Sequence, residues 1–212
     1  MAQEAREDPI PRFFAPTRTI SFTDAVFAVV ITILVLGIEA PSTLDVSVAE
    51  FEEIRRTAAH QLWVYFVSFC IVGSYWIQHT VLFGSLRSIN RPMTVLNLLY
   101  LLPVTLLPFV TQVMGAHRTA WWGVALFGGV NLATIFIYSL VWAHAVRHLG
   151  PKEASSIAHL GRSVAPKLAL FSGVILAGVV VSTVDTSAGV SVFLLVPAIF
   201  VYTYLRAPKQ SR

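Results

Sequence analysis

The chain has 212 residues, of which 56% are hydrophobic and only 12% are charged. Its mean hydropathy of +0.71 lies outside the range of ordinary soluble domains and indicates a polytopic membrane protein. In such a chain the net charge of +4 and the pI of about 9.5 reflect the placement of loops relative to the membrane, so they do not indicate nucleic-acid binding.

Long apolar windows divide the chain, each near the roughly 20 residues that a helix needs to cross the hydrocarbon layer. The first window is longer than the roughly 7 to 15 apolar residues of a cleavable signal peptide, so we interpret it as an uncleaved first span. The sequence predicts six transmembrane helices, at 18–39, 59–81, 92–114, 120–147, 166–184 and 188–206. We therefore expect one all-α membrane domain at 18–206, an N-terminal tail at 1–17 and a C-terminal tail at 207–212.

Two connections between the predicted helices have distinct compositions. Residues 40–58 form the longest external segment, which we interpret as a loop entering an N-terminal extension of the second helix; its acids Glu50, Glu52 and Glu53 complement the helix dipole there. The fifth and sixth helices are separated only by VDTSAG (184–189), a turn-forming stretch that predicts an antiparallel hairpin.

The distribution of lysine and arginine predicts the orientation in the membrane. Twelve of the 15 basic residues fall in the two tails, the second loop and the fourth loop with its flanks, whereas Arg55, Arg56 and Arg118 fall on the opposite side. Because cytoplasmic loops are enriched in basic residues, this bias places both termini in the cytoplasm.

The first span, RTISFTDAVFAVVITILVLGIE (18–39), contains an aspartate near its start. An acidic side chain in a membrane helix needs a partner or a wet environment. Arg18 precedes Asp24 by six residues, about 600° of helix rotation, so the two side chains lie on different faces. We expect Asp24 to accept a hydrogen bond from another helix, although direct contact with a permeating substrate is the alternative. The richest group of donors lies on the second helix: Tyr75, Trp76, Gln78 and His79.

A second feature of this span is a stripe of residues spaced by three and four. Such a stripe is usually a helix-packing face. Its single threonine has an equally simple interpretation, a hydrogen bond back to the carbonyl four residues earlier. The stripe consists of Phe22, Ala25, Val29, Thr32, Leu36 and Glu39.

The first span resembles the start of the transmembrane protein 175 family, the endolysosomal potassium channels and their bacterial and archaeal relatives. The family signature is an arginine, three residues, then Phe-Ser-Asp. Here Arg18, Phe22 and Asp24 match, and Thr23 replaces the serine with another small hydroxyl residue. Further patterns similar to the family are Trp76 to His79 in YWIQHTVLF, Asn90 and Asn97 in INRPMTVLNLLYLL, and LPF at 107–109.

This resemblance implies a homotetramer of six-span subunits in a prokaryotic plasma membrane, with the first helices lining a central pathway for potassium and other monovalent cations. It implies no cofactor besides the permeant ion. When the pore positions of the family are transferred to this sequence by counting from Asp24, the residues of the constriction are Val29, Thr32 and Leu36. The residues that hold the pore helix in place are then Arg18, Phe22, Thr23, Asp24, Trp76 and His79.

Four copies of the stripe form rings of valine, threonine and leucine. Apolar rings can gate a pore by dewetting, but they have no polar atoms to replace the water around an ion. We therefore expect Thr32 to discriminate between cations and Val29 and Leu36 to act as barriers. Glu39 at the external end either attracts cations or is an ordinary helix-end charge. The chain lacks a TVGYG-type filter, so we expect modest selectivity.

Two other function classes are weighed against a channel. A secondary transporter or proton/cation carrier would use broken helices, and Pro103 and Pro108 interrupt the third span. A membrane enzyme could use His144 and His148, which share a helix face, with His159 in the following loop. No carboxylate or cysteine completes that histidine set, so we expect no enzyme activity and no metal site.

Overall fold

A computed structural model of the chain describes residues 16–38, 47–86, 88–117, 119–148 and 151–205. The described elements are helical and follow one another as α1 (Pro16–Leu34), η2 (Val35–Gly37), α2 (Val48–Gly84), α3 (Arg91–Ala116), α4 (Trp121–His148), α5 (Pro151–Ser182), α6 (Thr186–Val192) and α7 (Leu195–Leu205). The helices α1 to α5 contain segments that are long and apolar enough to cross a membrane. The expected all-α membrane fold is therefore confirmed.

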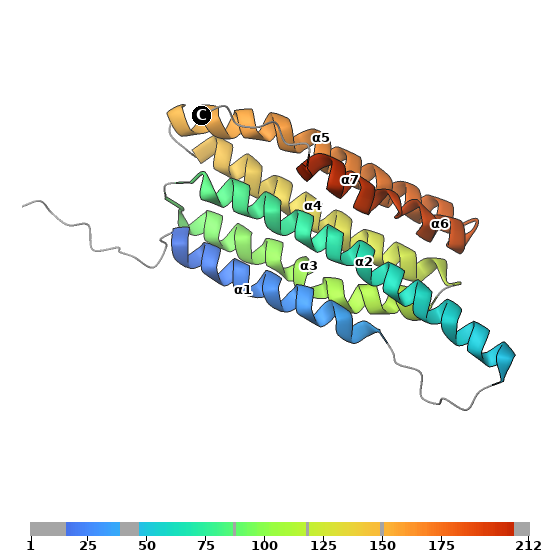
Figure 1. Ribbon diagram of the computed structural model, residues 1–212. Helices are drawn as coiled ribbons and strands as arrows, with labels where there is room; N and C mark the ends of the chain where they lie inside the picture. The colour runs from blue at the N-terminus through green and yellow to red at the C-terminus, as the bar shows by residue number, and fades with distance from the viewer. Residues whose placement is uncertain (1–15, 39–46, 87, 118, 149–150, 206–212) are drawn as a thin grey trace, which may run out of the picture.

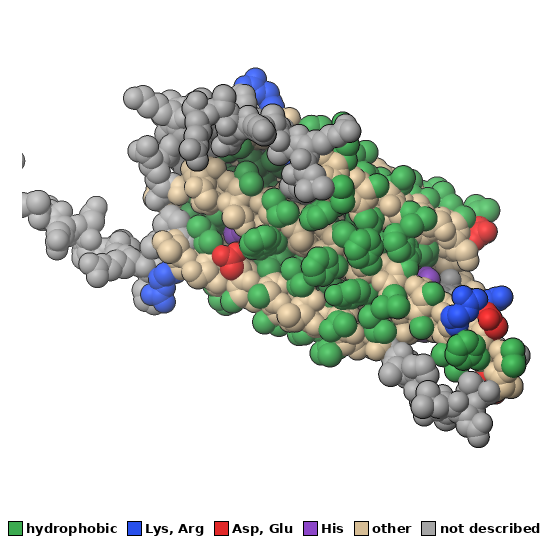
Figure 2. Space-filling view, viewed as in Figure 1, with side chains coloured by type: hydrophobic (Ala, Val, Ile, Leu, Met, Phe, Trp, Pro, Cys, Tyr) green, Lys and Arg blue, Asp and Glu red, His purple; other side chains and the backbone are tan. Residues whose placement is uncertain are grey.

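The long helices lie side by side in a bundle (Figure 1). Helix α1 packs on α2 and α3, α3 packs on α4, and α5 to α7 cover the far side of the bundle. Hydrophobic side chains dominate the face shown in Figure 2, and charged side chains gather toward its two ends. Such a distribution suits a body that meets lipid along its length and water at both ends. The predicted orientation and tail boundaries remain predictions, because residues 1–15 and 206–212 lie outside the described ranges.

Helix α2 is much longer than the roughly 20 residues that cross a hydrocarbon layer, in agreement with the predicted N-terminal extension. It has 37 residues and begins with a capping box, in which Glu50 accepts a hydrogen bond from the Ser47 backbone N–H at 2.7 Å while the Ser47 side chain accepts from the Glu50 N–H. This reciprocal pair satisfies two backbone donors at the helix start. Beyond the C-terminal ends of α1 and α3, the first turns of α2 project from the bundle (Figure 1).

The fifth and sixth spans differ from the prediction. Helix α5 begins at Pro151 instead of 166, and Pro166 lies inside it. The prediction treated the charges of 152–167 as loop residues, but charges outside the hydrocarbon layer do not end a helix, and proline is well placed at a first helical position. The predicted sixth span, 188–206, is divided between α6 and α7, so the sixth crossing remains a prediction.

The predicted hairpin after the fifth span is present, but its turn is shorter than VDTSAG, because α5 ends at Ser182 and α6 begins at Thr186. Asp185 caps α6 by accepting a hydrogen bond from the Ala188 N–H at 3.0 Å. Glycines then allow α5 and α6 to approach closely: a Cβ atom on Gly189 would lie 2.6 Å from the Cα and N atoms of Ser182. The turn therefore depends on the absence of a side chain at Gly189.

We predict that Gly189→Ala destabilises the protein by about 1–3 kcal/mol, the usual cost of forcing atoms into a packed contact. The midpoint of thermal unfolding in detergent measures this loss. Gly173→Ala is the matched control, because a Cβ there meets nothing within 4 Å and alanine favours the helix. An unchanged midpoint for Gly189→Ala would contradict the close approach of α5 and α6.

Candidate functional site

Helix α1 has one packed face and one outward face. Its packed face consists of Thr23, Phe27, Val30 and Leu34, all buried within the protomer. On the outward face, Phe22, Val29 and Leu36 are 53%, 54% and 74% exposed, and Thr32 is also exposed. The three residues predicted to form the constriction therefore lie together on the surface of the protomer.

The hydroxyl of Thr32 donates back to its own helix. Its Oγ1 lies 3.0 Å from the carbonyl oxygen of Ala28 and 2.9 Å from that of Val29. A hydroxyl has one donor hydrogen and two acceptor lone pairs. This backbone hydrogen bond uses the hydrogen and leaves the oxygen able to accept, so the local bond is compatible with contact to a cation.

An apolar groove runs along the outward face between α1 and α3, with a volume of about 590 Å³. Residues of α3 at helical spacing form one wall: Thr105, Pro108, Phe109 and Gln112. The other wall is on α1 and the following turn: Phe22, Ala25, Val26, Val29, Val30, Ile33, Leu36 and Gly37. Phe22, which the family signature assigns to the network that holds the pore helix, lines this groove.

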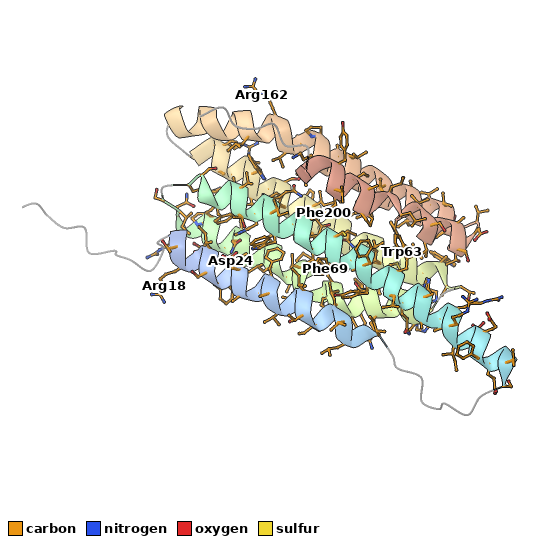
Figure 3. The ribbon with its side chains drawn as sticks, in the orientation of Figure 1. Arg18, Asp24, Trp63, Phe69, Arg162 and Phe200 are labelled. Carbon is orange, nitrogen blue, oxygen red and sulfur yellow. The ribbon has the colours of Figure 1, made fainter. Side chains whose placement is uncertain are left out.

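Asp24 accepts a hydrogen bond from the second helix, as its position in the sequence predicts. The indole Nε1 of Trp76 donates to its Oδ1 at 2.9 Å. Figure 3 shows Arg18 at the start of α1, apart from Asp24. The bond joins α1 to α2 near one end of the bundle, where both side chains retain exposure.

A second set of hydrogen bonds ties α1 to α3 and α2, and it is buried. Asn97 Nδ2 donates to Thr23 Oγ1 at 2.8 Å, and Asn97 Oδ1 lies 3.0 Å from His79 Nε2. Since Oδ1 can only accept, His79 must carry its hydrogen on Nε2. All three side chains are at most 1% exposed.

His79 is held by aromatic packing as well. Its ring stacks on Phe83 with centroids 4.1 Å apart and lies parallel to Tyr100 at 6.1 Å. Its Nδ1 is buried and has no hydrogen-bond partner among the described residues. His79 is therefore a fixed interior residue, linked to α1 through Asn97 and separate from the Trp76–Asp24 bond.

The remaining predicted residues lie elsewhere. Glu39 is outside the described residues. His144 Nε2 lies 3.1 Å from Asn90 Oδ1, which also accepts from the Met93 N–H at the start of α3. The side chains of His148 and His159 are not described. Within the described part of the chain, no three His, Cys, Asp or Glu residues gather in a way that could hold a metal ion.

The hydrogen bonds of Asn97 to Thr23 and His79 were not predicted from the sequence. An asparagine inside an apolar span was the available signal, because a buried amide needs partners. The α3 wall of the groove was also missed. Its spacing of Thr105, Pro108, Phe109 and Gln112 was visible, but the spacing alone does not say which helix lies opposite.

Comparison with known proteins supports the resemblance found in the first span. Residues 18–108 match the family model described as "Endosomal/lysosomal potassium channel TMEM175". A protein of Streptomyces collinus named as a potassium channel is 28% identical over 138 residues, 61% of this chain and 64% of that relative. The match thus spans less than two thirds of the relative's length. The human endosomal/lysosomal proton channel TMEM175 is 25% identical over 144 residues, 67% of this chain and 28% of the human protein.

The fold has a solved counterpart. The crystal structure of a lysosomal potassium-selective channel TMEM175 homologue from Chamaesiphon minutus superimposes with a TM-score of 0.71 and 22% sequence identity, covering 89% of this chain and 98% of that chain. The two chains share a fold. The predicted resemblance to the TMEM175 family is confirmed over residues 18–108, where the family model matches.

We predict that Asn97→Leu destabilises the protein, because it leaves the Thr23 hydroxyl and the His79 N–H buried without their partner. Each unsatisfied group costs about 1–3 kcal/mol. The unfolding midpoint in detergent should fall clearly. Trp76→Phe is the comparison variant: it removes the more exposed bond to Asp24 and should cost less. A larger loss of stability for Trp76→Phe than for Asn97→Leu would contradict the importance of the buried hydrogen bonds of Asn97.

Proposed function

We propose that this relative of the TMEM175 family is one subunit of a passive, modestly selective, potassium-permeable cation channel, whose pore is lined by α1 from four copies. The observation that carries the proposal is the outward face of α1. An apolar span with Val29, Thr32 and Leu36 on the protomer surface suits a shared central pathway. The names of the relatives describe channels and not enzymes.

Each of the three positions has a different role in the proposed pore. Rings of Val29 and Leu36 form apolar barriers, which hydrated ions cross only when the rings widen or wet. A ring of Thr32 hydroxyls offers four oxygen atoms between these barriers. Because their hydrogens are engaged with the backbone of α1, the oxygens are oriented to accept a cation.

The two sets of hydrogen bonds serve to fix the pore helix. The buried hydrogen bonds of Asn97 to Thr23 and His79 set the rotation of α1 against α2 and α3. The Trp76–Asp24 hydrogen bond holds the first turns of α1 against α2. Arg18 lies at the start of α1, and Phe22 lines the groove toward α3; we assign both to the support of the pore helix, as the family signature implies. We assign Asp24 to holding the helix and not to ion contact, and we assign Glu39 to attracting cations at the external mouth.

A carrier is the alternative within the same topology. A carrier would typically have broken helices at its binding site; Pro103 and Pro108 lie inside α3, which continues through both of them. Protons are a further candidate substrate, since the human relative is named as a proton channel. A channel conducts down a gradient without a coupled ion, whereas a carrier saturates and requires its co-substrate.

The test is ion flux through purified protein in liposomes. We predict passive potassium flux for the unmodified chain and a fall of about fivefold in the potassium-to-sodium permeability ratio for Thr32→Ala, equivalent to about 1 kcal/mol of lost discrimination. Unchanged selectivity in Thr32→Ala would remove the proposed role of the hydroxyl ring.

Thr32→Ser is the matched control, because it retains the hydroxyl and should retain the permeability ratio. The same liposomes separate the channel from the carrier. Single-channel currents support the channel, whereas flux that saturates and stops without a second ion gradient would replace it with the carrier.

A further inference from the structure

Leu36 is carried by a different kind of helix from Thr32. The helix α1 ends at Leu34, and Leu36 lies in the 3-10 turn η2. After this turn the backbone N–H of Ile38 donates to the Val35 carbonyl at 3.1 Å. The hydrogen bonds of a 3-10 turn have poorer geometry than those of an α-helix. The proposed ring of Leu36 is therefore carried by a weaker segment than the ring of Thr32.

The close contact of this turn is with α3. Leu34 is 2% exposed, but η2 contains no buried residue. Short 3-10 turns are common at helix ends, so the turn is informative only through what it touches. A Cβ atom on Gly37 would lie 3.4 Å from the Cβ of Gln112 and 3.6 Å from its Cγ. The absence of a side chain at Gly37 therefore lets the turn rest directly on Gln112.

The turn lies between two hollows. On its outward side is the groove of about 590 Å³, which Leu36, Gly37 and Gln112 line. Behind it is a cavity of about 10 Å³, which Gly37 and Gln112 also line together with Gln61. The contact between Gly37 and Gln112 thus separates the two hollows. Because pockets of the size of the groove hold whole small-molecule ligands, a leucine side chain can enter it.

Helix α3 has a weak point beside Gln112. Pro108 lies four residues earlier, inside α3, and lines the groove. Proline has no backbone N–H, so the Val104 carbonyl lacks the helical donor that another residue would supply. Helices bend at such positions. The end of α3 that carries Gln112 can therefore move relative to the part that holds Thr23 through Asn97.

We propose that Gln112 is a positioning residue for the Leu36 barrier. Its contact with Gly37 holds η2 so that Leu36 stays on the outward face, and loss of the contact lets Leu36 swing into the groove toward α3. The ring of Leu36 then widens while Thr32, on α1, keeps its place. The inference rests on the proposed four-subunit pore, because the leucines form a ring only there.

The surroundings of the two residues favour separate movement. The groove wall beside Leu36 includes Ile33, Pro108 and Phe109, so a leucine that enters it exchanges one apolar surrounding for another. Thr32 is bonded through its hydroxyl to the backbone of α1. Leu36 can therefore open and close the pathway without disturbing the proposed ring of hydroxyls.

A reversible cross-link tests the assignment. The Cβ atoms of a disulfide lie about 3.5–4.5 Å apart, close to the 3.4 Å between a Cβ on Gly37 and that of Gln112. We predict that Gly37→Cys with Gln112→Cys, in a chain whose buried Cys70 is replaced by alanine, forms a disulfide within each subunit. Copper phenanthroline with oxygen takes up the two electrons and two protons of the thiols. Potassium flux should fall to near that of protein-free liposomes and return with dithiothreitol.

Adding Leu36→Ala to the cysteine pair shows whether the lock acts through Leu36. In this triple variant the disulfide should form, as measured by the loss of reactive thiols, but flux should persist because a ring of alanine is too small to close. An equal loss of flux with and without Leu36→Ala would overturn the role of Gln112. A disulfide that forms in the cysteine pair and leaves flux unchanged or higher would also overturn it. Each single cysteine variant should conduct equally with and without oxidant.

A second measurement uses no introduced cysteine. Gln112→Ala removes the Cγ atom that approaches Gly37 and should raise the initial rate of potassium flux about twofold or more, because the population shifts toward the released turn. Gln112→Met is the conservative comparison: it keeps the Cβ and Cγ atoms and should conduct as the unmodified chain does. A lower or unchanged rate in Gln112→Ala would overturn the assignment, since a merely structural contact does not restrain flux.

These outcomes separate the assignment from the channel itself. If the unmodified chain conducts potassium but the lock has no effect, the assignment of Gln112 fails and the channel stands. If neither the unmodified chain nor any variant conducts in either redox state, the proposed channel fails and the assignment of Gln112 fails with it.

Discussion

The buried hydrogen bonds between Thr23, Asn97 and His79 are the constraint on which the arrangement of α1 depends. They join three helices through side chains that have almost no exposure. Rotating α1 away from this position would leave buried polar groups unsatisfied, at about 1–3 kcal/mol for each. Apolar packing alone would permit many rotations of a helix as uniformly hydrophobic as α1. Because Thr23 must face Asn97, Thr32 must face outward.

The outward face links this constraint to the proposed function. A threonine between a valine and a leucine has little to bind in a lone protomer, and lipid gains nothing from its hydroxyl. Four such faces around an axis would give the oxygen atoms a ligand and the apolar rings a gating role.

The sequence predicted this architecture at some levels and not at others. Hydropathy located the first four spans, and the impossibility of pairing Arg18 with Asp24 within one helix correctly directed attention to Trp76 on α2. The start of α5 was wrong because charged residues were taken to end a helix that continues past the membrane. The position of Asn97 between Thr23 and His79 was not predictable, since periodicity gives the face of a helix but not the neighbour that lies against it.

The accessibility of position 32 to water-soluble reagents tests the central claim most directly. Cys70 is the one cysteine of the chain, and a Cys70→Ala variant removes it. With Thr32→Cys in this background, a charged methanethiosulfonate should modify the thiol and reduce potassium flux, and a high potassium concentration should slow the modification. Leu176→Cys, an exposed position on α5, provides the lipid-facing comparison and should leave the flux unchanged. If position 32 does not react in protein that conducts, or reacts without any change in flux, α1 does not line the pathway.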